Sequence, residues 1–201
     1  MSPKMKDLEY REEFSLFGQP MIDDFGDGGQ RKFHGIYRGA VVSNFDPEFR
    51  GRIMARVTDV TGIFTTSWAE PVVPFAGPNA GHLSVPPVNA GVWIEFENGD
   101  PDKPVWLGGL WGSTIEAPVT AKTIGSMGPA GAATLIQSMD LNFICIADKG
   151  MFAGLPAGGV LISAGPGTTI MIDKTGIRMT APSVMINGAT VTFNGGALVI
   201  T

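Results

Sequence analysis

Four acidic residues lie close together in the segment EFENGDPD and are the first candidates for catalysis. Glu95 and Glu97 are two positions apart, and so are Asp100 and Asp102. A pair of carboxyl groups at a suitable separation is what a glycoside hydrolase uses as its acid and its base or nucleophile. However, the two glutamates alternate with apolar residues, which places them on the outer side of a strand, and the two aspartates flank a proline in a hairpin loop. The pattern therefore favours a structural role over a glycosidase site.

A second motif that could do chemistry is DKTG, at residues 173–176. It matches part of the sequence that P-type ATPases phosphorylate. That reaction needs a nucleotide-binding domain and a Mg²⁺ site, and the sequence shows neither. Because Asp, Thr and Gly are common in tight turns, we interpret the motif as a corner between two strands.

Residues that could bind a metal or a phosphate are few and scattered. His34 and His82 are the only histidines and Cys145 is the only cysteine, whereas a metal site needs several donors at suitable spacing. The glycine-rich stretches GPAGAA and GPGTT lack the Lys-Ser/Thr ending of a phosphate-binding loop. The sequence predicts no catalytic residue, no metal site and no cofactor.

The aromatic residues raise the question of ligand stacking. Trp68, Trp93, Trp106 and Trp111 could stack on bases or sugars. Proteins that bind single-stranded nucleic acid combine such side chains with a basic groove, but the net charge is −5 and this region has no cluster of Lys or Arg. We expect the tryptophans to be buried in a barrel or at contacts between subunits, and we expect no nucleic acid partner.

The elements that hold these residues are predicted to be strands. Only 16% of the 201 residues are charged, while Gly (28) and Pro (15) are abundant, which favours short strands and turns. In RIMARVTDV, Ile53, Ala55 and Val57 share one face. GVWIEFENGDPDKPVWLGGLWG is predicted to be a hairpin that reverses at Asn98-Gly99. Four or five strands in residues 33–112 with no helical period between them predict a small barrel.

The C-terminal residues 169–201 show an apolar pattern that repeats every seven positions. A coiled coil spaces its apolar pair three and four residues apart, whereas the spacing here is two and five. Side chains two residues apart share one face of a strand but point ~200° apart on a helix. Each unit is therefore predicted to be a strand of about five residues and a corner of about two. The ten core positions are Ile170, Ile172, Ile177, Met179, Val184, Ile186, Val191, Phe193, Leu198 and Ile200.

Five such units are too few to form a core within one chain, because stacked repeats bury their apolar faces only against neighbours. Three chains wound around one axis would bury all ten positions. We therefore predict an obligate homotrimer that ends in an intertwined, triple-stranded β-helix, in which each buried Ile, Val or Leu contributes ~1.5–3 kcal/mol.

Three stretches, RGAVVSNFDPEFRGRIMARV, SWAEPVVPFAG and PPVNAGVWIEFENGDPDKPVWLGGLWG, resemble a known family over most of the chain. They are similar to the OB-fold domain of central spike proteins of contractile injection systems. This family includes phage baseplate assembly protein V and the valine-glycine-repeat spikes of type VI secretion. The resemblance implies a trimeric, non-enzymatic spike at the baseplate tip, an OB-fold barrel followed by a β-helix, which is driven through the target envelope when the sheath contracts.

The predicted organisation is all-β with four segments. Residues 1–31 form an arm that contacts a hub protein or the trimer, 32–113 the OB-fold domain, 114–158 a Gly-, Ala- and Pro-rich neck with one strand (LNFICIAD), and 159–201 the trimeric β-helix spike. Because the arm leads directly into the OB-fold domain in this sequence, we do not expect the large hub-like N-terminal domains of type VI spikes. The resemblance therefore implies a separate hub protein above the trimer.

The C-terminal end is expected to bind a further protein. Leu198 and Ile200 form a core pair without a polar cap, and uncapped repeat ends invite pairing. We expect a small tip protein of the PAAR-repeat type to bind the segment Gly196, Ala197, Leu198, Val199, Ile200 and Thr201. The alternative function is a trimeric β-helical adhesin or receptor-binding fibre. Phage, tailocin and other injection systems remain open as the source.

The expected location follows from the start of the chain and from the cysteine content. No apolar signal core follows Met1, no apolar run reaches transmembrane length, and a lone cysteine suits a reducing compartment. We expect assembly in the cytoplasm of the producing cell, without a signal peptide. By resemblance, the product is part of a virion or injection-particle baseplate and contacts the target envelope transiently.

Overall fold

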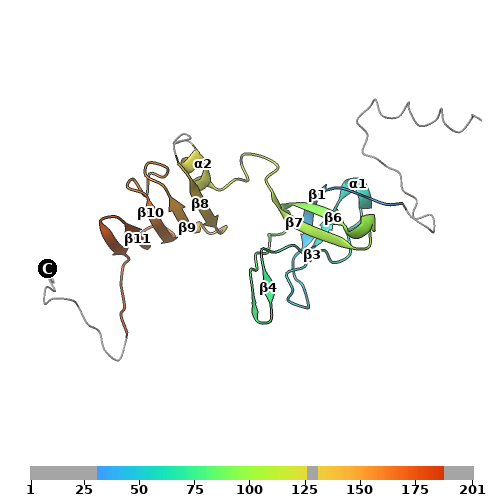
Figure 1. Cartoon of the computed structure of the whole chain (residues 1–201), viewed down its shortest axis with the longest axis horizontal. Coiled ribbons are helices and arrows are strands. Elements are labelled where there is room, and N and C mark those ends of the chain that lie inside the picture. The colour runs from blue at the N-terminus through green and yellow to red at the C-terminus, as the bar shows by residue number, and fades with distance from the viewer. Residues whose placement is uncertain (1–30, 126–130, 188–201) are drawn as a thin grey trace, which may run out of the picture. The chain divides into compact units, whose positions relative to one another are not determined.

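The computed structural model describes residues 31–125 and 131–187 (Figure 1). These residues form many strands and two short α-helices, which confirms the all-β prediction. The chain divides into two compact units between Gly112 and Ser113, and each unit has its own sheet and its own core. Within the described ranges, no helix is both long and apolar enough to cross a membrane.

The first unit contains a five-stranded sheet in the order β2-β1-β6-β7-β3. Ile53, just before β2, and Ala69, just before β3, exchange both backbone hydrogen bonds, at 3.2 and 2.8 Å. This bridge brings the two edge strands together, so that the sheet closes on itself as in the five-stranded OB-fold. The strands are β1 (Tyr37–Ser43), β2 (Met54–Arg56), β3 (Glu70–Pro71), β6 (Gly91–Phe96) and β7 (Pro104–Leu110).

Short elements connect the strands of this barrel. Helix α1 (Thr58–Thr61) follows β2, and the small hairpin of β4 (Ala76–Gly77) and β5 (Ala80–Gly81) lies between β3 and β6. The 3-10 turn η1 (Glu97–Gly99) begins the β6–β7 reversal, with Asn98 and Gly99 at positive φ. The predicted hairpin and its reversal point are confirmed.

The barrel core follows the alternation of the sequence. Ile53, Ala55 and Val57 are fully buried, as are Val92 and Ile94. Their neighbours in sequence point outward, because successive side chains of a strand face opposite sides. The predicted inward faces of both segments are therefore confirmed. The remaining members of the core cluster are Val41, Ala69, Phe96 and Trp106.

The turn between β1 and β2 is fixed by one buried carboxylate. Asp46 accepts hydrogen bonds from the backbone N–H groups of Glu48 (3.0 Å), Arg50 (2.8 Å) and Arg52 (3.2 Å). It also accepts hydrogen bonds from Nε (3.1 Å) and Nη2 (2.7 Å) of the Arg52 guanidinium. That guanidinium in turn packs over the Trp68 ring. The turn is therefore rigid, since a single side chain satisfies most of its donors.

The second unit is a five-stranded antiparallel meander in the order β12-β11-β10-β9-β8. Helix α2 (Val119–Gly125) precedes it, and Ile124 of this helix packs on the core of the unit. Each strand pairs with the next one along the chain, as Figure 1 shows. The strands are β8 (Ala133–Gln137), β9 (Asn142–Ala147), β10 (Gly159–Ala164), β11 (Thr169–Asp173) and β12 (Gly176–Thr180).

The segment predicted as a neck with one strand contains two, β8 and β9, and both belong to the same sheet as β10. The turn between them, with Leu141 at positive φ, has no glycine or proline to announce it. Residues 133–137 therefore form a strand that no local turn signal predicts.

One face of this sheet is covered by the connection between β9 and β10. Met151, Phe152 and Leu155 of this connection are buried against Cys145 of β9 and Leu161 of β10. Burial of these side chains fixes the sheet on one side only, which leaves the opposite face without a cover from this connection.

Removing the centre of this cover should destabilise the second unit. Leu155 is 1% exposed, so Leu155→Ala creates a cavity, and we expect a loss of ~2–5 kcal/mol in the free energy of unfolding of this unit. Chemical denaturation followed by circular dichroism measures it. The matched control is Ile115→Ala, at a position that is 86% exposed, for which we expect a change within ~0.5 kcal/mol. Equal effects of both variants would contradict the described core.

Candidate functional site

The outer face of the second sheet is apolar across all five strands. The pairings place Ile144 opposite Ile136 and Ile162, and Ile170 opposite Ile162 and Met179. A second, parallel row lies two residues away on each strand. We call this surface the isoleucine face; its two rows are Ile136, Ile144, Ile162, Ile170, Met179 and Thr134, Ile146, Val160, Ile172, Ile177.

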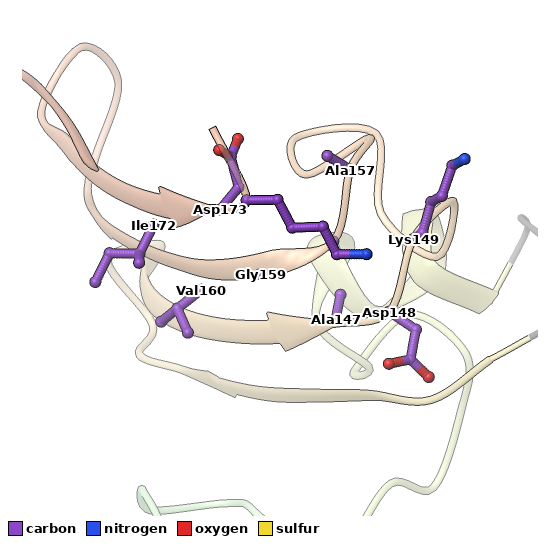
Figure 2. Close-up of a pocket in the computed structure, with 10 residues that line it drawn as sticks. Ala147, Asp148, Lys149, Ala157, Gly159, Val160, Ile172 and Asp173 are labelled. Carbon is purple, nitrogen blue, oxygen red and sulfur yellow. The ribbon is translucent and has the colours of Figure 1, made fainter. Parts of the chain in front are cut away.

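The isoleucine face is exposed in the single chain. Every isoleucine and the methionine on it are exposed, from about two fifths of the surface at Ile170 and Ile162 (39% and 41%) to 68% at Ile177. The neighbouring residues in sequence, such as Cys145 and Leu161, are buried under the cover. Figure 2 shows Val160 and Ile172 projecting to one side of the sheet and Ala147 and Asp173 to the other. A continuous exposed apolar surface of this kind marks an interaction site.

Four of the ten predicted core positions lie on this face: Ile170, Ile172, Ile177 and Met179. Val184 and Ile186 are exposed and lie in residues 183–187, which form no strand in the single chain. Val191, Phe193, Leu198 and Ile200 lie outside the described residues, and so do the predicted tip-binding residues 196–201 and the arm up to residue 30.

The other half of the face lies outside the predicted seven-residue repeat. Its members are Ile136, Ile144, Ile146, Val160 and Ile162. The signal that could have found them is the alternation in TLIQ, NFICIA and GVLIS, where every second residue is β-branched or apolar. Their alignment with the repeat could not be deduced, because register between strands depends on pairing and turn geometry.

The predicted unit of the seven-residue repeat is present twice. Strands β11 and β12 each have five residues, and Lys174 and Thr175 form the corner between them. In the single chain these strands pair with each other as a hairpin. The intertwined β-helix of three chains therefore remains a prediction.

The DKTG motif forms this corner, as predicted. The Asp173 carboxylate accepts hydrogen bonds from the Thr175 backbone N–H (2.7 Å) and hydroxyl (2.6 Å) and forms an ion pair with Arg178. The two bonds from Thr175, followed by the Arg178 guanidinium, hold the pKa of Asp173 below its usual range. A carboxylate engaged in this way closes a turn.

The acidic group of the barrel is also part of a turn. Glu95 lies on the outward side of β6, and Glu97 comes directly after the strand. Both side chains are exposed. Asp100 accepts the backbone N–H of Asp102 at 3.0 Å and lies 3.7 Å from the Lys103 ammonium. These contacts explain the four residues as elements of a hairpin.

The tryptophans occupy different environments. Trp106 is buried and donates its indole N–H to the Gly51 carbonyl at 3.1 Å. Trp68 and Trp93 are half-buried under the guanidinium groups of Arg52 and Arg38, whereas Trp111 is mostly exposed. They do not gather into one stacking platform, because Trp68 and Trp93 are each paired with an arginine and Trp106 lies inside.

Polar groups that could bind an ion are also dispersed. His34 and His82 are exposed and Cys145 is buried under the cover of the second sheet, where burial raises the pKa of its thiol. Among residues 31–125 and 131–187, no three His, Cys, Asp or Glu side chains form a group that could hold a metal ion.

A shallow hollow at one end of the second sheet is lined by Lys149, Gly159 and Asp173, among others (Figure 2). Asp148 on its rim accepts the Ala132 backbone N–H at 2.8 Å, which fixes the start of β8. Its acidic groups are thus engaged in turns and strand ends.

Comparison with protein families matches both units. Residues 37–111 match the family described as the type VI secretion system and phage-baseplate injector OB domain. Residues 133–199 match the phage baseplate V C-terminal trimerisation domain, a range that contains the whole isoleucine face. No curated protein sequence matches the chain significantly.

Proposed function

The chain belongs to the family of baseplate spike proteins of phages and type VI secretion systems, and we propose that three copies form the central spike that a contractile tail drives through the envelope of the target cell. Both matched families consist of structural baseplate domains, and the C-terminal one is a trimerisation domain. The chain is therefore a trimeric structural component of a baseplate. Its part in piercing and its position at the tip are the proposal.

The isoleucine face is the single observation that supports this proposal most strongly. Three copies that turn this face toward a common axis would bury it completely, and each buried isoleucine contributes ~1.5–3 kcal/mol to the association. The opposite face is already covered by residues 151–155 of the same chain. One sheet per copy, covered outside and apolar inside, is the geometry of one side of a three-sided prism.

The repeat continues this surface beyond β12. Val184 and Ile186 keep the spacing of two that Ile170 and Ile172 have on β11, and they are exposed. A strand requires a partner for its backbone N–H and C=O groups, and none of the strands within residues 31–125 and 131–187 pairs with residues 183–187. We propose that other copies supply it, so that residues 183–201 form the intertwined β-helix.

A rod of this kind suits axial loading. Strands that pair with other copies on both sides cannot separate individually, and the β-branched side chains have few rotamers into which to deform. Unfolding requires the separation of three chains, which gives kinetic stability. A separate hub protein above the OB-fold domains and a PAAR-type protein at residues 196–201 complete the proposed assembly.

Cryo-electron microscopy of contractile particles from the producing cells tests the proposed position. We expect density for three copies on the central axis of the baseplate, below the inner tube, and loss of this density when the gene is deleted. A control particle from cells complemented with the unaltered gene should regain it. Copies found at the periphery of the baseplate, as fibres, would contradict the spike and indicate an adhesin.

A further inference from the structure

The OB-fold domain has an apolar surface of its own, at the end of the barrel where the chain leaves it. Phe45 and Phe49 of the β1–β2 turn are 77% and 84% exposed, and Leu83 and Val85 are exposed beside them. The Asn44 side-chain amide donates to the Pro86 carbonyl at 2.9 Å, and the Leu83 side chain lies against the backbone of Gly51. The turn and residues 83–86 therefore form one surface.

The β1–β2 turn that carries this surface is rigid, although its backbone is strained at Phe49. Phe49 has a φ of 57°, a left-handed conformation that is uncommon for a bulky residue without a glycine's freedom. The turn is nevertheless locked by the five hydrogen bonds of the Asp46 carboxylate. Strained backbone positions cluster at functional sites, so the φ of Phe49 is a reason to ask what its exposed side chain contacts.

The same end of the barrel is tied to the trimerisation unit. Ala40 pairs with Gly91, and Gly91 pairs with Leu110, the last residue of β7. The end of β1, the start of β6 and the exit of the chain after β7 are thus neighbours. Residues 111–118 link this exit to α2, whose Ile124 packs on the core of the second unit, so the trimeric second unit tethers three such ends. A connection of this length spans at most ~29 Å, which gives effective concentrations in the millimolar range.

We infer that the Phe45–Phe49 turns of three copies pack against one another around the three-fold axis, and so form a second contact between copies in addition to the isoleucine face. The occupant of the surface is a second copy of this chain, since the tether brings identical ends together. Weak apolar contacts that would not form between free domains are populated at such effective concentrations. This inference rests on the proposed trimer.

Site-directed crosslinking of the full chain tests it. Phe49→Cys should give covalent dimers on a denaturing gel after mild oxidation or treatment with a short bismaleimide. Each copy carries one new thiol near the axis, so one crosslink joins two of the three copies. The matched control is Ile63→Cys. Ile63 is 82% exposed but follows α1 at the opposite end of the barrel, and we expect no dimer. The unaltered chain, whose Cys145 is fully buried, should give none either.

Sedimentation of the same samples distinguishes a failure of the inferred contact between the turns from a failure of the proposed trimer. A trimer in which Phe49→Cys fails to crosslink, or crosslinks no more than Ile63→Cys, would overturn the inference and leave the proposed function intact. A sample that is not trimeric would contradict the proposed function itself. If the Phe49→Cys thiol reacts with a maleimide dye in the isolated trimer but is protected in assembled particles, the surface belongs to another baseplate protein, and the inference is wrong.

Discussion

Ile162→Asp should convert the trimer into separate chains. Ile162 lies in the central strand of the second sheet, between Ile144 and Ile170 on the isoleucine face. In the proposed trimer, Ile162 of each copy is buried near the three-fold axis. The substitution would therefore place three carboxylates close together at that axis. Light scattering coupled to size exclusion measures the mass of the particle.

The expected effect is large because two terms add. Loss of a buried isoleucine removes ~1.5–3 kcal/mol per copy, or roughly three times that per trimer. Desolvation of an ionised carboxylate costs several kcal/mol more. Since ~1.4 kcal/mol changes an equilibrium constant tenfold, the association constant of the trimer should fall by more than about a thousandfold.

Two controls separate this effect from a general loss of folding. Ile162→Val keeps the apolar face and should cost only ~0.5–1.5 kcal/mol, so it should remain trimeric. Ile115→Asp introduces the same charge at a position outside the sheet that is already exposed, and it should remain trimeric as well. A stable Ile162→Asp trimer would show that the isoleucine face is not the contact.

Asp46→Asn should lower the stability of the OB-fold domain more than any single substitution on its surface. The substitution removes the charge that holds Arg52, whose side chain is 9% exposed, and disturbs the acceptor for three backbone N–H groups. Removing one partner of a buried ion pair leaves the other charge poorly compensated. The carboxylate of Glu48, 3.0 Å from the Arg52 guanidinium, would compensate only in part because it is exposed.

The same pair predicts a dependence on pH. The hydrogen bonds from the Arg52 side chain, and then those from the backbone N–H groups of residues 48, 50 and 52, hold the pKa of Asp46 well below its usual range. A depressed pKa in the folded state contributes stability that is present above the unfolded value of about 3.9. This stability is lost progressively as the pH falls below that value.

Thermal denaturation of the chain between pH 3 and pH 7 measures both effects. The unaltered domain should lose stability toward acid, and Asp46→Asn should have a lower midpoint at neutral pH and a flatter dependence below about pH 4. Asp102→Asn, at an exposed loop position, is the matched control and should change neither. An Asp46→Asn variant as stable as this control at pH 7 would refute the structural role of the pair.

Much of the fold could be predicted because the local patterns are strong. Val92, Ile94 and Phe96 share one face of a strand whose other face carries Glu95, and Asn98-Gly99 supplies a recognised reversal, so period and turn chemistry predict the hairpin. The seven-residue repeat likewise predicts strand β11, the corner at Lys174 and Thr175, and strand β12.

The rest depended on contacts between distant segments. Nothing local indicates that Ile136 and Ile144 align with Ile162 and Ile170, because the register of each pair is set by its turn and by the cover over the other face. The cover itself, residues 148–158, is rich in Gly and Ala and has no periodic pattern. Consequently the seven-residue repeat predicts only half of the isoleucine face, although the members of the other half alternate as clearly as those of the repeat.

Sedimentation equilibrium of the unaltered full chain tests the central claim most directly. If the apolar sheet faces of three copies meet on one axis, a single species with three times the mass of the chain should persist from micromolar to nanomolar concentration. A folded particle with the mass of one chain at micromolar concentration would contradict the account.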